Sequence, residues 1–505
     1  MSRVSISLGA IEGISSDGVH RFLGVPYAEP ITAVRRFMPP RPKSSWHGVL
    51  DAKRYGATCI QTPMAGLFEQ LSPDPSLAGP DCLNLNIWTP DPGASLPVMV
   101  WIHGGAFYAG TGNDEFYKGD EFARSGVVVV AINYRLGAQG FLELSHFGEA
   151  YESSGCVGIM DQVCALQWVR RHISQFGGDP NRVTIAGESA GAMSVSTLLT
   201  VPSARGLFQR AIAQSGAANN SMPKALAQIV TRELLSKLDI HDPSELNMVS
   251  DQNLLEAQVA LMQEIETSQD VNRFGPLTGS PMIFQPVYGS AFLPEHPSIG
   301  LAKGVASEVA LLQGVTRHEA PIFFYDLVEV LDDVLAQQLC APIAQAAGLD
   351  IEIVDRHYLA HDAPPLAKVG AFMSDFMFNI PTTEMLSAQA THNPHVWAYR
   401  FDWENPSFGG VLQAHHFIEV PFVFQTPNSD AAKKFGLDEA PERLIEIVHN
   451  VWVSFVTNGD PNHQDLPHWP TWQGYDVRAC MCFNETCSVE TFVDADTLKI
   501  WSVRT

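Results

Sequence analysis

Residues 187–191 form the pattern Gly-x-Ser-x-Gly, which can carry a nucleophilic serine. A strand-like run, residues 182–186, precedes this pattern, and an apolar, helix-permissive run, residues 192–199, follows it. Strand, tight turn and helix form the context in which such a serine is exposed. The glycines remove Cβ atoms where strand and helix come close, and a helix N-terminus favours developing negative charge. The pattern therefore predicts Ser189 as a catalytic nucleophile.

A second motif upstream could stabilise the intermediate that this serine would form. The sequence His-Gly-Gly-Ala-Phe at residues 103–107 follows a predicted strand, and its glycine pair lets backbone N–H groups approach an oxyanion. Each motif by itself has a plain alternative, a βα turn or a chance Gly/Ser loop. Together, in this order and about 80 residues apart, they are far more specific. The predicted oxyanion donors are the N–H groups of Gly105, Ala106 and Ala190.

Strands and helices must position these motifs. Residues 83–88, 97–103 and 127–134 are predicted strands, and the last is an unbroken apolar run typical of a strand buried on both faces. Residues 161–176 carry apolar side chains on one helical stripe. Strand, helix, strand, elbow and helix then make a βαβ unit that leads to Ser189.

The rest of the chain predicts one α/β domain spanning residues 1–505. Residues 1–30 alternate and turn as β-hairpins do. Residues 221–270 and 330–390 have mostly helical patterns, and we interpret them as insertions over the sheet and the active site. No repeat, low-complexity tract or linker marks a second domain.

The chain resembles the type B carboxylesterases, the branch of the α/β-hydrolases that includes bacterial para-nitrobenzyl esterases. The resemblance runs from Val4 to the C-terminus. Its matching segments are residues 22–28, 81–87, 103–107, 133–137, 176–180, 187–191 and 214–216. It implies the α/β-hydrolase fold, with a large, mostly parallel central sheet flanked by helices.

The resemblance also implies the two remaining catalytic groups, because the order in this fold is serine, acid, histidine. The acid should lie in the segment Gly-Val-Thr-Arg-His-Glu, which makes it Glu319, with Asp326 and Asp375 as rivals. The family's histidine stands three residues before a glutamate that opens a Pro-Phe-x-Phe run. That spacing selects His416 over the adjacent His415, which we expect to be a bystander.

Further residues match family positions around the site. Met222, Ile322 and Phe323 are candidates for the substrate pocket, although each could simply be core packing. Glu188 and Ser215 are candidates for supporting the catalytic groups through hydrogen bonds.

The cysteines raise two questions, a disulfide and a metal site. Many family members close a loop with a disulfide where Cys59 and Cys82 stand; in a reducing cytoplasm the two would be buried neighbours instead. Cys480, Cys482 and Cys487 match no common zinc spacing, so we expect no metal site. The mechanism itself requires no metal or organic cofactor.

Composition limits the partners. The 505 residues carry a formal net charge of −24, which argues against nucleic acid and anionic membranes as partners. No signal peptide or bilayer-spanning stretch is visible, so we expect a cytoplasmic protein, a monomer or small homo-oligomer, with secretion by another route left open.

The leading hypothesis is a serine carboxylesterase that hydrolyses small or aryl carboxylic esters through an acyl-enzyme on Ser189. A hydrolase of amides, carbamates or polyester fragments would share all of this chemistry. A non-catalytic interaction protein is the third hypothesis, and the complete set of catalytic groups argues against it.

Overall fold

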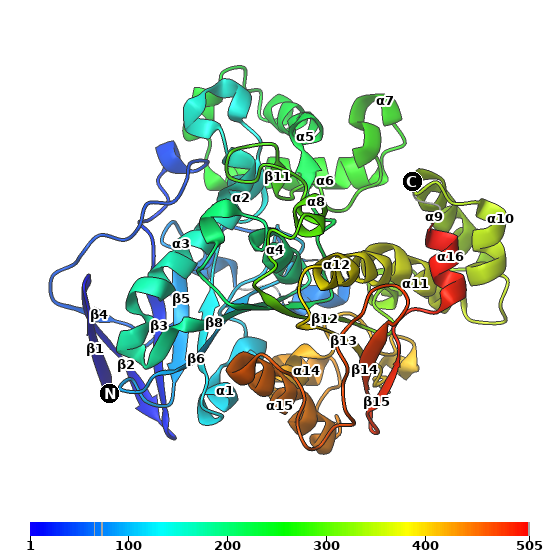
Figure 1. Ribbon diagram of the computed structural model, residues 1–505. Helices are drawn as coiled ribbons and strands as arrows, with labels where there is room; N and C mark the ends of the chain where they lie inside the picture. The colour runs from blue at the N-terminus through cyan, green and yellow to red at the C-terminus, as the bar shows by residue number, and fades with distance from the viewer. Residues whose placement is uncertain (65, 72–73, 503–505) are drawn as a thin grey trace.

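A 13-stranded sheet runs through the protein in the computed structural model, which describes residues 1–64, 66–71 and 74–502 (Figure 1). Its order is β1-β2-β3-β5-β7-β6-β8-β9-β12-β13-β14-β15, with β4 beside β2. All neighbours from β7 to β14 in this order are parallel, whereas the remaining pairs are antiparallel, except that β4 runs parallel to β2. The strands are β1 Ser2–Ile6, β2 Gly9–Ser16, β3 Val19–Pro26, β4 Val49–Asp51, β5 Asn84–Thr89, β6 Leu96–Ile102, β7 Val128–Ile132, β8 Gly178–Glu188, β9 Arg210–Gln214, β12 Ala310–Thr316, β13 Val396–Phe401, β14 Ala479–Phe483 and β15 Ser488–Thr491.

The central strands are buried on both faces, as the apolar run at residues 127–134 predicts. In β7, Val128, Val130 and Ile132 belong to one hydrophobic cluster, whereas Val129 and Ala131 belong to another. Since successive side chains of a strand point to opposite faces, the two clusters lie on opposite sides of the sheet. Each of these five side chains is fully buried.

Helices cover both faces of this sheet (Figure 1). Helices α3 and α4 contribute to the first cluster, and α1 and α15 contribute to the second. The helices are α1 Asp120–Arg124, α2 Gly137–Phe141, α3 Val157–His172, α4 Ala190–Leu198, α5 Lys224–Lys237, α6 Asp251–Thr267, α7 Val271–Phe274, α8 Pro297–Ala302, α9 Asp333–Ala346, α10 Ile351–Val354, α11 Pro365–Ser374, α12 Ile380–Ala390, α13 Val420–Val423, α14 Asp430–Lys434, α15 Glu442–Asn458 and α16 Ala495–Trp501.

Helix α3 begins earlier than its sequence pattern predicts, at Val157 instead of residue 161. Val157 and Ile159 are buried, so the apolar stripe already starts in this turn. The helix ends as predicted: a 3₁₀ turn, Ile173–Phe176, leads to Gly177, whose φ of 82° suits glycine.

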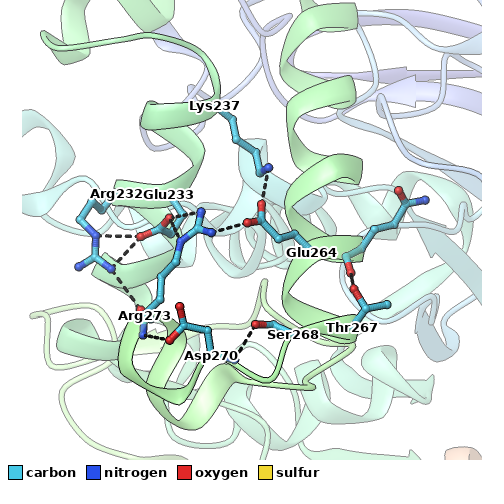
Figure 2. A network of polar contacts seen from close by, with 9 residues as sticks. Arg232, Glu233, Lys237, Glu264, Thr267, Ser268, Asp270 and Arg273 are labelled. Carbon is cyan, nitrogen blue, oxygen red and sulfur yellow. Dashed lines mark hydrogen bonds and ion pairs between the residues drawn. The ribbon is translucent and has the colours of Figure 1, made fainter.

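The first helical insertion is held together by charges (Figure 2). Two short strands outside the main sheet, β10 Met222–Pro223 and β11 Val287–Tyr288, pair with each other and contact α5. The guanidinium of Arg273 on α7 binds Glu233 of α5 at 2.7 Å and also binds Glu264 of α6. Lys237 of α5 binds Glu264 from the other side at 2.5 Å. One arginine, just beyond the predicted end of the insertion, therefore links α5, α6 and α7.

The fold class inferred from the sequence is confirmed by this mostly parallel sheet with helices on both faces. Helices occupy both segments predicted to be insertions, while the assignment of residues 1–505 to one domain stays a prediction. Among the described residues, no helix combines the length and apolar character that a bilayer crossing demands.

Candidate active site

Ser189 occupies a sharp turn between β8 and α4. Its φ of 55° and ψ of −124° lie in a region that residues with a side chain rarely adopt. Two backbone hydrogen bonds hold it there: its N–H donates to the Gln214 carbonyl at 2.9 Å, and its carbonyl accepts from the Met193 N–H at 2.9 Å. Strain of this kind persists where the surrounding structure enforces it, and it is typical of functional sites.

The glycines of the elbow are required by close backbone contacts. A Cβ on Gly191 would collide with the carbonyl oxygen of Ile102, at the end of the neighbouring strand β6. The loop after β6 approaches the serine directly, because a Cβ on Gly104 would lie 3.1 Å from the Ser189 Cβ. The His-Gly-Gly loop and the elbow are therefore packed against each other.

The predicted oxyanion loop also has unusual backbone geometry. Gly105 has a φ of 110°, and Ala106 has a φ of 50° although it carries a Cβ. The Gly105 carbonyl accepts hydrogen bonds from the N–H groups of Tyr108 and Ala109, at 3.0 and 2.9 Å, which close the loop into a tight turn. Ala190, the third predicted donor, is the first residue of α4, where N–H groups have no partner within the helix.

Glu319 and His416 form a close, buried pair. The Nδ1–H of His416 donates to Glu319 Oε2 at 2.5 Å, and the glutamate is fully buried. The other carboxylate oxygen accepts from the Ser215 hydroxyl at 2.5 Å and from the Thr316 backbone N–H at 2.8 Å. These bonds fix the carboxylate, and the carboxylate fixes the tautomer of the imidazole.

The second imidazole nitrogen of His416 points to the elbow. Its Nε2 lies 3.0 Å from the Oε1 of Glu188, the residue directly before Ser189. Burial lowers the pKa of His416, but the charges of Glu188 and Glu319 outweigh burial and raise the pKa well above its usual value. The two carboxylates thus stabilise the positive charge that the imidazole gains when it takes up a proton.

The rivals for the acid and the base have other partners. Asp375 accepts from Tyr358 and Asn379, each at 2.7 Å, and Asp326 lies beside Gly66, the first residue of a 3₁₀ helix, Gly66–Leu71. The ring of His415 donates from Nδ1 to the His416 carbonyl at 2.8 Å, and burial lowers its pKa to about 4. Among the described residues, the carboxylates in contact with His416 are Glu188 and Glu319.

Aromatic rings cover the face of the His416 imidazole. The centroid of Phe323 lies 5.1 Å from that of His416, and the centroid of Phe378 lies 5.0 Å from it. Phe323 stays 42% exposed, and Phe68 stacks on it at 5.7 Å. Of the three predicted pocket residues, Phe323 is thus placed beside the histidine.

The other two predicted pocket residues, Met222 and Ile322, are buried in the first and second hydrophobic clusters respectively. Their role in a substrate pocket stays a prediction. Phe378 carries no motif and lies far from the elbow in sequence, so sequence reasoning missed it.

Glu419 is a further buried carboxyl near this site. It is fully buried, and its Oε1 accepts from the Gln214 side chain at 3.1 Å. Burial raises the pKa of Glu419 to about 8, and the nearby charges of Glu188 and Glu319 add to the shift. Sequence reasoning used Glu419 to select His416 but assigned it no function.

We expect Glu419 to make the protein less stable as pH rises. The pKa of Glu419 in the folded state lies above its value of about 4.3 in the unfolded state. Between these two pKa values the folded state binds more protons than the unfolded state. The free energy of unfolding therefore falls by up to about 1.4 kcal/mol for each unit by which the pH rises. Glu419→Gln removes this dependence. Thermal unfolding at about pH 5, 7 and 9 should therefore show a variant Tm that improves relative to wild type as pH rises. A difference in Tm that does not change with pH would contradict the prediction.

The cysteines form no disulfide, including the pair for which the family resemblance suggested one. Cys59 and Cys82 are buried free thiols in contact, and burial raises the pKa of Cys59 well above its usual value. The structure therefore has the alternative that the sequence left open: the two cysteines are buried neighbours without a disulfide bond. Protonated thiols suit such an apolar environment, because burial disfavours a thiolate.

One group of possible metal ligands occurs among the described residues: Asp402, Cys482 and Glu490. The guanidinium of Arg400 binds both carboxylates, at 2.6–2.7 Å and 3.0 Å. Because this cation already neutralises the two carboxylates, the group is poorly suited to a metal ion.

A serine in a strained elbow, a glycine loop packed against it and a buried histidine–glutamate pair make a serine hydrolase the natural comparison. Residues 1–501 match the model of the carboxylesterase family. The chain belongs to this family. It is 37% identical over 481 residues to the para-nitrobenzyl esterase of Bacillus subtilis (strain 168). The aligned region covers 93% of this chain and 92% of that protein.

Another relative and two solved structures also match this carboxylesterase over nearly its whole length. It is 34% identical to the phenmedipham hydrolase of Pseudarthrobacter oxydans, with 95% of each chain covered. A solved structure of a thermophilic PNB esterase matches with a TM-score of 0.86 at 34% identity, over 99% of both chains. The carboxylesterase of Geobacillus stearothermophilus at pH 6.2 matches with a TM-score of 0.85 and 34% identity, over 99% of this chain and 100% of that one. The protein therefore has the α/β-hydrolase fold and is a serine hydrolase of carboxylic esters.

Proposed function

We propose that Ser189, Glu319 and His416 are the catalytic triad with which this carboxylesterase hydrolyses small or aryl esters. His416 Nε2 takes the proton from Ser189 Oγ as the oxygen attacks the ester carbonyl, and Glu319 stabilises the imidazolium that forms. The alcohol leaves with the proton from His416, and water then repeats the sequence on the acyl-enzyme. The N–H groups that would bind the oxyanion belong to Gly105, Ala106 and Ala190.

The observation that carries this proposal is the contact between His416 and Glu319 at 2.5 Å, with the opposite imidazole nitrogen beside Glu188, the residue before Ser189. Glu319 is buried and held by two further hydrogen bonds, so it keeps its orientation throughout the reaction. The exposed ring of Phe323 beside His416 supports a preference for aryl groups, because an aryl substrate can stack on it.

A covalent label tests the proposed nucleophile. A fluorescent organophosphonate should modify the protein at a stoichiometry of one, and peptide mass mapping should place the adduct on Ser189. The label should be lost when a para-nitrophenyl ester competes. An adduct on a different residue, or no adduct, would refute the assignment.

The role of Glu319 is tested by an isosteric change. Glu319→Gln keeps the size of the side chain but removes its charge and favours the wrong imidazole tautomer, so we expect kcat to fall by about 10⁴-fold. The KM for a para-nitrophenyl ester should change little, because Glu319 lies behind the histidine. Asp326→Asn is the matched control, since Asp326 was a rival for the acid and lies beside Gly66; it should keep wild-type kcat.

Carbamates, amides and polyester fragments are the second candidate class, because a relative in this family is named phenmedipham hydrolase. A panel of aryl ester, carbamate and anilide with the same leaving ring, compared by kcat/KM, separates the classes.

The proposal also includes the cytoplasmic location and the monomeric or small oligomeric state inferred from the sequence.

A further inference from the structure

A π-helical turn, Asp375–Asn379, lies in the helical layer beside the candidate active site. It joins α11 to α12 without a break, and it contains Phe378. Such wide turns are rare, and they frequently occur at functional sites. The π turn changes the angular position of the side chains that follow it, so Phe378 need not point where an α-helix would direct it.

This segment contacts the ring of His416 and the residue that follows Glu319. The buried ring of Phe378 lies 5.0 Å from the ring of His416. Directly before the π turn, the Ser374 hydroxyl accepts a hydrogen bond from the N–H of Ala320 at 3.0 Å, and Ala320 follows Glu319. A displacement of the π turn would therefore disturb the histidine ring and the backbone of the acid together.

A chain of hydrogen bonds holds the π turn from its far side. The first residue, Asp375, accepts from the side chain of Asn379, the last residue of the turn, and from the hydroxyl of Tyr358, each at 2.7 Å. The Tyr358 oxygen in turn accepts from Nε1 of Trp501 at 2.7 Å, and both aromatic side chains are buried. Trp501 ends α16, and its ring stacks on Phe372 of α11 at 5.7 Å.

The geometry points to Tyr358 and Asp375 as positioning residues for the acid–base pair: they fix the π turn that holds Phe378 against His416. Through Trp501, the C-terminal helix α16 is part of the same support. Tyr358 also packs edge-on against Phe372 of α11 at 5.4 Å, so its ring is held independently of its hydroxyl. This inference rests on the proposed function, because it gives His416 and Glu319 their catalytic roles.

Removing single hydrogen bonds tests the inference without large changes in packing. Tyr358→Phe and Asp375→Asn should each lower kcat for a para-nitrophenyl ester by about tenfold, because small displacements of a catalytic group have large effects. KM should stay unchanged, and the acid limb of the kcat/KM profile, which reports His416, should shift. Phe378→Leu should act similarly, and Tyr358→Phe combined with Phe378→Leu should lower kcat less than the product of the single effects.

A matched control separates positioning from general stability. Ser387→Ala removes a comparable buried bond on α12, from Trp472 Nε1 at 3.2 Å, without touching the π turn. Active-site titration with the phosphonate corrects each rate for the folded fraction. If Tyr358→Phe lowers Tm as Ser387→Ala does and keeps kcat and the pH profile of wild type, the inference is wrong. Lack of hydrolysis and of labelling in the wild type would instead refute the proposed function.

Discussion

Replacing Ser189 with alanine is expected to lower kcat for a para-nitrophenyl ester by about 10⁶-fold. The substitution removes the oxygen that forms the acyl-enzyme, so hydrolysis falls to what binding and the oxyanion donors can supply without a nucleophile. The KM should change little, because the hydroxyl contributes mainly to chemistry. Initial rates under substrate saturation, with protein purified away from host esterases, measure the effect.

Ser194→Ala is the control for this prediction. Ser194 lies further along α4, is fully buried and accepts a hydrogen bond from Gln162 at 3.0 Å. Its removal should lower Tm but leave kcat close to that of wild type. Ser189→Ala should do the opposite, and it should no longer react with the organophosphonate. Full hydrolysis by Ser189→Ala would show that another residue is the nucleophile.

The elements nearest Ser189 could be predicted because local sequence determines them. The run at residues 127–134 is apolar at every buried position of β7, and the glycines at 187 and 191 stand where a Cβ would collide with backbone. The order of the 13 strands has no comparable local signal, because it depends on pairing between distant segments. The family resemblance supplied only the expectation of a large, mostly parallel sheet.

The supporting groups of the site were harder to predict. Thr316 acts through its backbone N–H, which any residue other than proline could supply, so its side chain gives no signal. Phe378 reaches His416 from a π turn, where the helical period of 3.6 residues that sequence analysis assumes does not hold. Asp375 shows the same difficulty: the pattern placed it in a regular helix, whereas its carboxylate closes the π turn through Asn379.

The adjacent histidines give the second prediction with a large effect. His416→Asn should lower kcat by about 10⁵- to 10⁶-fold, because the general base and the serine act as a unit. In His415→Asn, kcat should stay within about tenfold of wild type, since that ring bonds to the backbone of His416 and not to its imidazole. The two side chains are neighbours in sequence, but His416 bonds to Glu319 at 2.5 Å, whereas His415 bonds to a backbone carbonyl.

Combining the two catalytic substitutions makes this prediction sharper. If His416 activates Ser189, then Ser189→Ala and His416→Asn together should lower kcat no further than either does by itself. Multiplying effects would mean that the two residues act independently. His415→Asn, by contrast, should multiply with Ser189→Ala, because a packing change acts apart from the transfer of the proton. A large loss in His415→Asn with a small one in His416→Asn would reverse the assignment and leave Glu319, the partner of His416, without a catalytic role.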